Sequence, residues 1–263
     1  MLCVLGVEAA ATVGCGAPLM KLPTGPGTPA SDTASALTEA TTACAGIRTL
    51  TAEVAASGKV GGQRFRAKLL VGVAAPAAAR VEAVAPFGSP FFILAANDDD
   101  TTLLLPRDER ALQHGRSADV LDAVAGVPLS AADLRVVLTG CAAAVARPEG
   151  RALGADWRVI DTGPGEALYL HRTGDSPWQL AVVSRAPWRV EYRDHLNGLP
   201  RSMRITSAAA DKSAGSFDVT LALSQVETNV PLGAEVFRVD LPRGAQPITL
   251  DELRHARPGV REN

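Results

Sequence analysis

The sequence predicts a mainly β fold with helices (α+β): a single curved antiparallel half-barrel of about eleven strands, covered by a short helical lid. Apolar and polar residues alternate with period two in many short runs on both sides of residues 117–140. Such alternation places one face of a strand on a core and the other in water. Residues 117–140 have helical spacing instead, and one more helix is expected before the first strand.

The length and composition suit one large β domain or two small ones. The chain has 263 residues, of which 47% are hydrophobic, and a net charge of −2. Basic and acidic residues are interspersed without a basic stripe, which argues against nucleic acid as a partner. No apolar run reaches the roughly 18 residues of a membrane-spanning helix.

The N-terminus suggests a lipid anchor. A short apolar run ends in Thr12-Val13-Gly14-Cys15, which is typical of a bacterial lipoprotein signal, and a Gly/Pro-rich stretch follows. We therefore expect a signal peptide at 1–14, truncated at its start, an acylated Cys15 with a flexible tether at 15–30, and one domain at 31–263. The lack of a basic residue before Cys15 and the charge of Glu8 leave open an ordinary apolar N-terminus.

Two cysteines remain for the domain itself. Cys44 and Cys141 could form a disulfide in an oxidising compartment, or could be two buried small residues. The sequence does not decide between these alternatives.

The first half of the chain contains one helix and a set of strands. Residues 32–45 have an apolar helical face, a capping residue in Ser31 or Asp32, and Gly46 as a stop. Gly61-Gly62 marks a hairpin between the first two strands. The strands are expected at 50–57, 64–73, 80–83, 91–96 and 101–105.

The middle and second half follow the same logic. Residues 117–126 and 130–140 are expected to be helices, the second opened by a capping box of Ser130 and Asp133. Residues 247–254 form a last short helix or turn. The strands of this half are expected at 157–159, 168–170, 178–182, 188–192, 203–205 and 217–223.

The segment from Arg80 to Cys141 resembles the LolA/LolB family of bacterial lipoprotein carriers and receptors. It contains a strand ending in Ala85-Pro86-Phe87-Gly88, an apolar hairpin, Gly126-Val127-Pro128, and a helix ending in Leu138-Thr139-Gly140. Leu199-Pro200 before a strand and the run from Phe217 to Glu227 extend the likeness over roughly residues 45–245, closer to LolB.

The resemblance implies a half-open barrel with a helical lid and an apolar cavity for acyl chains. It also implies that Phe87, in the protruding turn, engages the membrane, with Phe91 and Phe92 enlarging the apolar tip; packing of Phe87 on its own domain is the alternative. The residues expected to line the cavity are Leu69, Val71, Val81, Ile93, Leu103, Leu121, Val124, Leu134, Leu138, Trp178, Leu180, Trp188 and Val190.

No constellation for catalysis is evident. His114, His171, His195 and His255 are scattered and lack the spacing of a metal site. No G-x-S-x-G elbow occurs, and Asp161-Thr162-Gly163 reads as a polar turn. We expect no cofactor, no metal and no enzymatic activity.

The sequence therefore predicts a lipoprotein of the outer membrane that faces the periplasm. It would bind acyl chains and take part in lipoprotein or lipid transfer, receiving its ligand from a periplasmic carrier protein. The alternative is a non-catalytic envelope lipoprotein that binds a protein partner, or senses stress, with the same fold.

Overall fold

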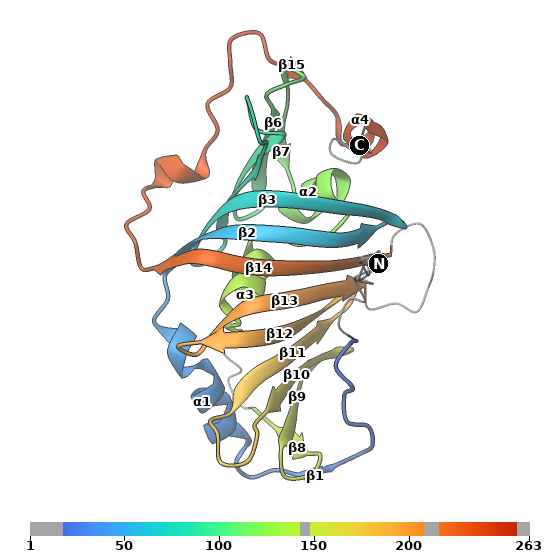
Figure 1. The fold of residues 1–263 in the computed structure, drawn as a ribbon, viewed down its shortest axis with the longest axis vertical. Coiled ribbons are helices and arrows are strands. Elements are labelled where there is room, and N and C mark those ends of the chain that lie inside the picture. Colours follow the sequence, from blue (N-terminus) through green and yellow to red (C-terminus); the bar gives the residue numbers. More distant parts are fainter. Residues whose placement is uncertain (1–17, 143–147, 208–215, 257–263) are drawn as a thin grey trace, which may run out of the picture.

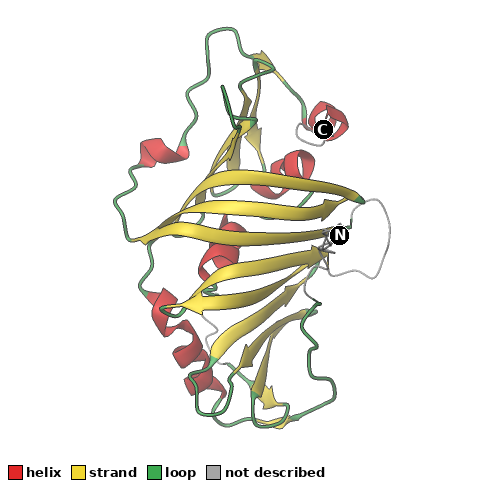
Figure 2. Cartoon of the chain, in the orientation of Figure 1, coloured by secondary structure: helices red, strands yellow, loops and turns green. Residues whose placement is uncertain are grey.

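The computed structural model describes residues 18–142, 148–207 and 216–256. These residues form one open, strongly curved sheet with helices on it, so the predicted fold class is confirmed (Figures 1 and 2). The sheet has 15 strands in the order β1-β8-β9-β10-β11-β12-β13-β14-β2-β3-β4-β5-β6-β7-β15.

The helices and strands have the following bounds. The helices are α1 (Thr33–Ala45), α2 (Ser117–Ala125), α3 (Ala131–Thr139), the 3₁₀ helix η1 (Ala234–Phe237) and α4 (Leu250–Ala256). The strands before α2 are β1 (Thr28–Pro29), β2 (Thr49–Val60), β3 (Gln63–Ala74), β4 (Ala78–Val84), β5 (Phe92–Asn97), β6 (Asp100–Leu105) and β7 (Arg110–Gly115). The strands after α3 are β8 (Gly150–Ala152), β9 (Trp157–Gly163), β10 (Glu166–His171), β11 (Gln179–Arg185), β12 (Trp188–Leu196), β13 (Leu199–Ser207), β14 (Phe217–Thr228) and β15 (Gln246–Pro247).

The pairing of β14 with β2 joins the two halves of the sheet. Phe217 lies opposite Val60 at one end of this antiparallel pair, and Thr228 lies opposite Leu50 at the other. Gly58 makes the close approach possible, because a Cβ there would collide with the carbonyl of Asp218. The strands on both sides of this seam therefore share one continuous concave face.

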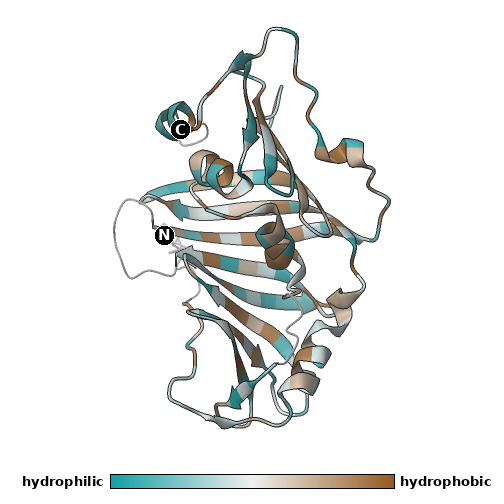
Figure 3. Ribbon diagram, turned by 180° about the vertical axis from the view of Figure 1, so that it is seen from behind, coloured by the Kyte–Doolittle hydropathy of each residue, from teal (hydrophilic) through white to brown (hydrophobic). Residues whose placement is uncertain are grey.

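Two helices from the middle of the chain cover that concave face. Figures 1 and 3 show α2 and α3 on the same side of the sheet, and Figure 3 shows α3 as strongly hydrophobic. The predicted capping box is present, with the Asp133 amide donating to Ser130 and the Ser130 amide donating to the Asp133 carboxylate. The α3 helix ends at Gly140, whose left-handed φ of 65° suits glycine.

The C-terminal segment wraps the β7 edge of the sheet. After β14, η1 packs against β4 and β5, and β15 then pairs with β7 in parallel. The α4 helix packs against α2 and buries Leu253 completely (Figure 1). The edge of the sheet is thereby covered, which protects its open backbone groups.

The predicted strands correspond to β2–β6 and β9–β14, and four strands were missed. The strands β1, β8 and β15 have two or three residues, too few to display a period. The strand β7 contains a register shift against β6 between Leu112 and Gly115, and its adjacent Ala111 and Leu112 are both buried, so its residues do not alternate.

The helix α1 begins where predicted but without the predicted cap. Asp32 is the N-cap residue, yet its carboxylate makes no capping bond. It accepts two hydrogen bonds from Arg158 of β9 instead, at 2.7 and 2.8 Å. These bonds lower the pKa of Asp32 and fix the helix to the sheet.

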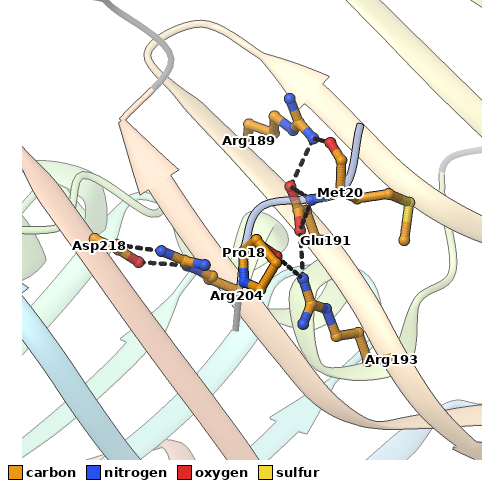
Figure 4. A network of polar contacts seen from close by, with 7 residues as sticks. All are labelled: Pro18, Met20, Arg189, Glu191, Arg193, Arg204 and Asp218. Carbon is orange, nitrogen blue, oxygen red and sulfur yellow. Dashed lines mark hydrogen bonds and ion pairs between the residues drawn. The ribbon is translucent and has the colours of Figure 1, made fainter. Parts of the chain in front are cut away.

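Part of the segment expected to form a flexible tether, residues 18–20, is docked on the sheet (Figure 4). The Met20 amide donates to both carboxylate oxygens of Glu191, at 3.0 and 2.9 Å. Arg189 donates to the Met20 carbonyl at 3.0 Å, and Arg193 donates to the Pro18 carbonyl at 2.8 Å. Both arginines also bind Glu191, whose side chain is completely buried. Residues 18–20 thus cover the outer, convex face of β12, and Cys15 lies outside the described residues.

Cys44 and Cys141 form a disulfide that ties the end of α1 to the residue after Gly140. The bond closes a segment with a sequence separation of 97 residues. Closing a loop of this length restricts the unfolded chain strongly.

We expect the double variant Cys44→Ala/Cys141→Ala to lower the free energy of unfolding by about 2–4 kcal/mol, measured by urea denaturation. Adding a reductant should destabilise the parent and leave the double variant unchanged; equal effects on both would contradict the prediction.

The docking of residues 18–20 leads to a second prediction. Met20→Pro removes the N–H group that donates to Glu191, so we expect residues 18–20 to detach from the sheet. Trypsin should then cut after the exposed Lys21 about tenfold faster, because the variant loses one charge-assisted hydrogen bond that holds the segment. Leu19→Pro is the control, because the Leu19 amide has no partner among the described hydrogen bonds. Equal cleavage rates in the two variants would argue against the docked state.

Candidate functional site

An apolar cavity of about 990 Å³ lies between the concave face and the helices. Strands β2, β3, β4, β13 and β14 form its floor, and α2, α3 and the residues between them form its roof. The apolar residues of the floor are Val54, Ala56, Val60, Phe65, Ala67, Leu69, Val71, Val81, Ala83, Ile205, Val219 and Leu221. Those of the roof are Leu121, Val124, Ala125, Val127, Leu129, Leu134 and Leu138.

The residues predicted to line a cavity divide into two groups. Leu69, Val71, Val81, Leu121, Val124, Leu134 and Leu138 are in the wall of this cavity, as are Phe91 and Phe92. The other predicted positions are not part of the wall: Ile93, Leu103, Trp178, Leu180, Trp188 and Val190.

The six residues of the second group do not line the cavity because they lie elsewhere in the structure. Ile93 is half-buried on the opposite face of β5, between the buried Phe92 and Leu94. Leu103 is completely buried on β6. The remaining four are buried core residues, because large side chains and α1 fill the half of the concave face over β9–β12. Trp178 shows this packing: the guanidinium groups of Arg158 and Arg172 lie 4.7 and 4.6 Å from its ring centre.

Sequence reasoning missed the residues that β2, β13 and β14 contribute. Val54, Ile205, Val219 and Leu221 alternate with polar residues, as predicted for strands. The signal that was lacking is the order of strands, since only the β14–β2 seam brings these positions under α2 and α3.

The cavity opens at the end of the sheet that contains the β2–β3 hairpin and the β6–β7 turn. The exposed lining residues mark this mouth: Gln63, Arg66, Phe91, Arg107, Asp108 and His255. The Arg107 guanidinium lies 4.2 Å from the ring centre of Phe91 and donates to the carbonyls of Ser89 and Phe87. The turn between β4 and β5 is therefore held beside the mouth.

Phe87 is the most exposed apolar side chain at this end. Its exposed fraction is 90%, against 37% for Phe91 and 8% for Phe92. The alternative that Phe87 packs on its own domain is wrong, because a side chain this exposed has almost no packing contact. Phe92 forms part of the cavity wall instead of an apolar tip.

The α4 helix closes one side of the cavity. Ile248 and His255 line it, and Arg110 of β7 forms an ion pair with Glu252 at 2.9 Å. The Glu252 carboxylate also accepts from the amide and hydroxyl of Thr249. These hydrogen bonds, with that from Arg110, lower the pKa of Glu252 to about 2.

The polar groups near the roof have structural partners. The Tyr192 hydroxyl donates to the Val136 carbonyl at 3.0 Å, and its burial raises the pKa of Tyr192. Within the described ranges, no group of three or more His, Cys, Asp or Glu side chains could hold a metal ion. In the same part of the chain, no helix is both long and apolar enough to span a bilayer.

Comparison with solved structures shows a LolA-like fold. A LolA superfamily protein from Nitrosomonas europaea superposes with a TM-score of 0.50 and 11% identity, over 79% of this chain and 97% of that one. A DUF1329 family protein from Desulfovibrio piger gives a TM-score of 0.47 and 12% identity, over 80% of this chain and 98% of that one. No family model and no curated protein sequence matches.

The α4 contact should depend on pH through Glu252. A carboxylate with a lowered pKa stabilises the folded state fully above its unfolded pKa of 4.5, and loses this effect as the pH falls towards 2. We expect Glu252→Gln to speed exchange of the Leu253 amide hydrogen at pH 6, and the variant-to-parent ratio to approach one between pH 4.5 and 2. Asp251→Asn on the same helix is the control. A ratio independent of pH would contradict the assignment.

Proposed function

We propose that this protein binds acyl chains in the cavity and takes part in the transfer of lipoproteins or lipids to the outer membrane. The observation that carries the proposal is the cavity itself: about 990 Å³, with an apolar floor and roof and its polar side chains at the mouth. This volume is at the upper end of small-molecule sites. A chain could enter methyl end first and leave its polar head at the mouth.

Transfer of this kind requires no covalent step. Each CH₂ group removed from water contributes about 0.8 kcal/mol. A difference of two or three buried CH₂ groups between a carrier, this cavity and a bilayer is therefore enough to set the direction of transfer. We propose no catalytic residue and no cofactor.

Two further features fit a task at a membrane surface. Phe87 projects from the turn beside the mouth and could enter a bilayer while the cavity releases its ligand. The helices α2 and α3 are the roof of the cavity and could act as its lid. Acylation of Cys15 would anchor the chain in the outer membrane, where Gly16 in place of Asp favours sorting.

A pair of adjacent substitutions tests the cavity. Leu69 lines its floor, whereas Leu70 lies on the opposite face of β3 and is 41% exposed. We expect Leu69→Trp to fill part of the cavity and to weaken binding of a fluorescent fatty-acyl probe at least tenfold. Leu70→Trp adds the same side chain to the convex face and should bind the probe as the parent does.

The measurement is a fluorescence titration, with thermal unfolding as a check on folding. Failure of the parent to take up the probe, together with a clean protein mass in native mass spectrometry, would overturn acyl-chain binding. The alternative, a module that binds a protein partner, would then be preferred.

A further inference from the structure

The β2–β3 hairpin places like charges directly opposite each other. Lys59 of β2 pairs in register with Arg64 of β3, and Arg66 follows two residues along the same face. Like charges at opposed positions of an antiparallel pair destabilise it. An uncharged polar residue in place of Lys59 or Arg64 would remove this repulsion and make the pair of strands more stable.

Neighbouring strands do not relieve this repulsion. Asp218 of β14 lies opposite Lys59 on its other side, but the Asp218 carboxylate binds Arg204 at 2.7 and 2.6 Å. Arg66 lies opposite Ser57, which has no charge. Among the residues that the structure describes, the side chains of Lys59, Arg64 and Arg66 have no hydrogen bond or ion pair, and all three residues are exposed. By contrast, Lys68 on the same face pairs with Glu53.

These cations border the mouth of the cavity. Gln63 and Arg66 line it on the hairpin side, while Phe91 and Arg107 line it on the side of the exposed Phe87 turn. Asp108 is the one acidic residue among those that line the cavity, and Glu252 nearby is paired with Arg110. The mouth is thus locally basic in a chain whose net charge is −2.

We propose that Lys59, Arg64 and Arg66 form a binding surface for the headgroups of anionic lipids in a bilayer. The chemistry matches on both sides of the mouth: an exposed aromatic residue suits the apolar–polar boundary of a membrane, and cations beside it suit a negatively charged surface. The repulsion between Lys59 and Arg64 falls when an anionic surface lies against them. This inference rests on the proposed function, because it names the membrane against which the cavity opens.

Vesicle sedimentation tests this surface. The protein is the full chain with Cys15→Ser, which removes the thiol of the proposed anchor. The vesicles contain phosphatidylcholine alone, or phosphatidylcholine with about a third of phosphatidylglycerol. We expect tighter binding to the anionic vesicles, weakened by added salt. The triple variant Lys59→Gln/Arg64→Gln/Arg66→Gln should lose about fivefold in partition coefficient for each charge removed, on anionic vesicles only.

The matched control changes the net charge equally at other exposed positions. Lys21→Gln/Arg48→Gln/Arg238→Gln removes three cations whose side chains have no bond among the described residues, and it should bind the anionic vesicles nearly as the parent does. Equal losses in the two triple variants would overturn the proposal, as would equal binding of the parent to both kinds of vesicle. Binding of the parent to duplex DNA or polyglutamate, weakened by the hairpin variant as much as binding to anionic vesicles is, would also overturn the proposal. The surface would then bind anionic polymers in general and would not be specific for lipid.

Two additional measurements separate this inference from the proposed function. Uptake of the fatty-acyl probe without vesicles should be unchanged in the double variant Lys59→Gln/Arg64→Gln, because neither side chain lines the cavity. Phe87→Ser should weaken binding to both kinds of vesicle and keep the preference for anionic ones. A parent that prefers anionic vesicles but takes up no probe would refute the cavity while supporting the hairpin surface.

Discussion

The pairing of β14 with β2 is the contact on which the rest of the structure depends. Without it, β2–β7 and β8–β14 would be two separate sheets, each with an apolar face that needs its own cover. With it, one concave face extends across both halves, and α3 bridges the seam because its Leu134 and Leu138 share a wall with Val54 and Val219. The α2 helix extends the cover over β6. The cavity exists because these two short helices cannot fill the space over so strongly curved a sheet.

The two ends of the concave face have different uses because of their side chains. Over β9–β12, tryptophans, Tyr192 and α1 fill the space, and arginines such as Arg158 pack on the tryptophan rings. Over β2–β4, alanine and valine are frequent, and a volume remains open. Large residues therefore make a rigid support on one side of the seam, and small ones leave room for a ligand on the other.

Local pattern was sufficient for most elements and insufficient for the cavity. Alternation located β2–β6 and β9–β14, and the Ser130–Asp133 capping box located α3, because each depends on residues close in sequence. The cavity depends on which strands are neighbours, so Leu69 and Val71 were identified correctly as wall residues while Trp178 and Val190, equally apolar, belong to the filled half. The docking of residues 18–20 was also not foreseeable, because their main-chain atoms make the contacts and composition alone indicated a free spacer.

The docking of residues 18–20 shortens the free tether that would lie between the domain and a membrane. Only two residues separate Cys15 from Pro18, whose carbonyl Arg193 holds, and three residue steps span at most about 11 Å. A lipid on Cys15 would then keep the outer face of β12 close to the bilayer. With residues 18–20 detached and β1 still paired, the thirteen steps from Cys15 to Thr28 would span up to about 45 Å. With a lipid on Cys15, the domain would therefore have two possible distances from the membrane, and the bond of Met20 to the buried Glu191 would determine which one applies.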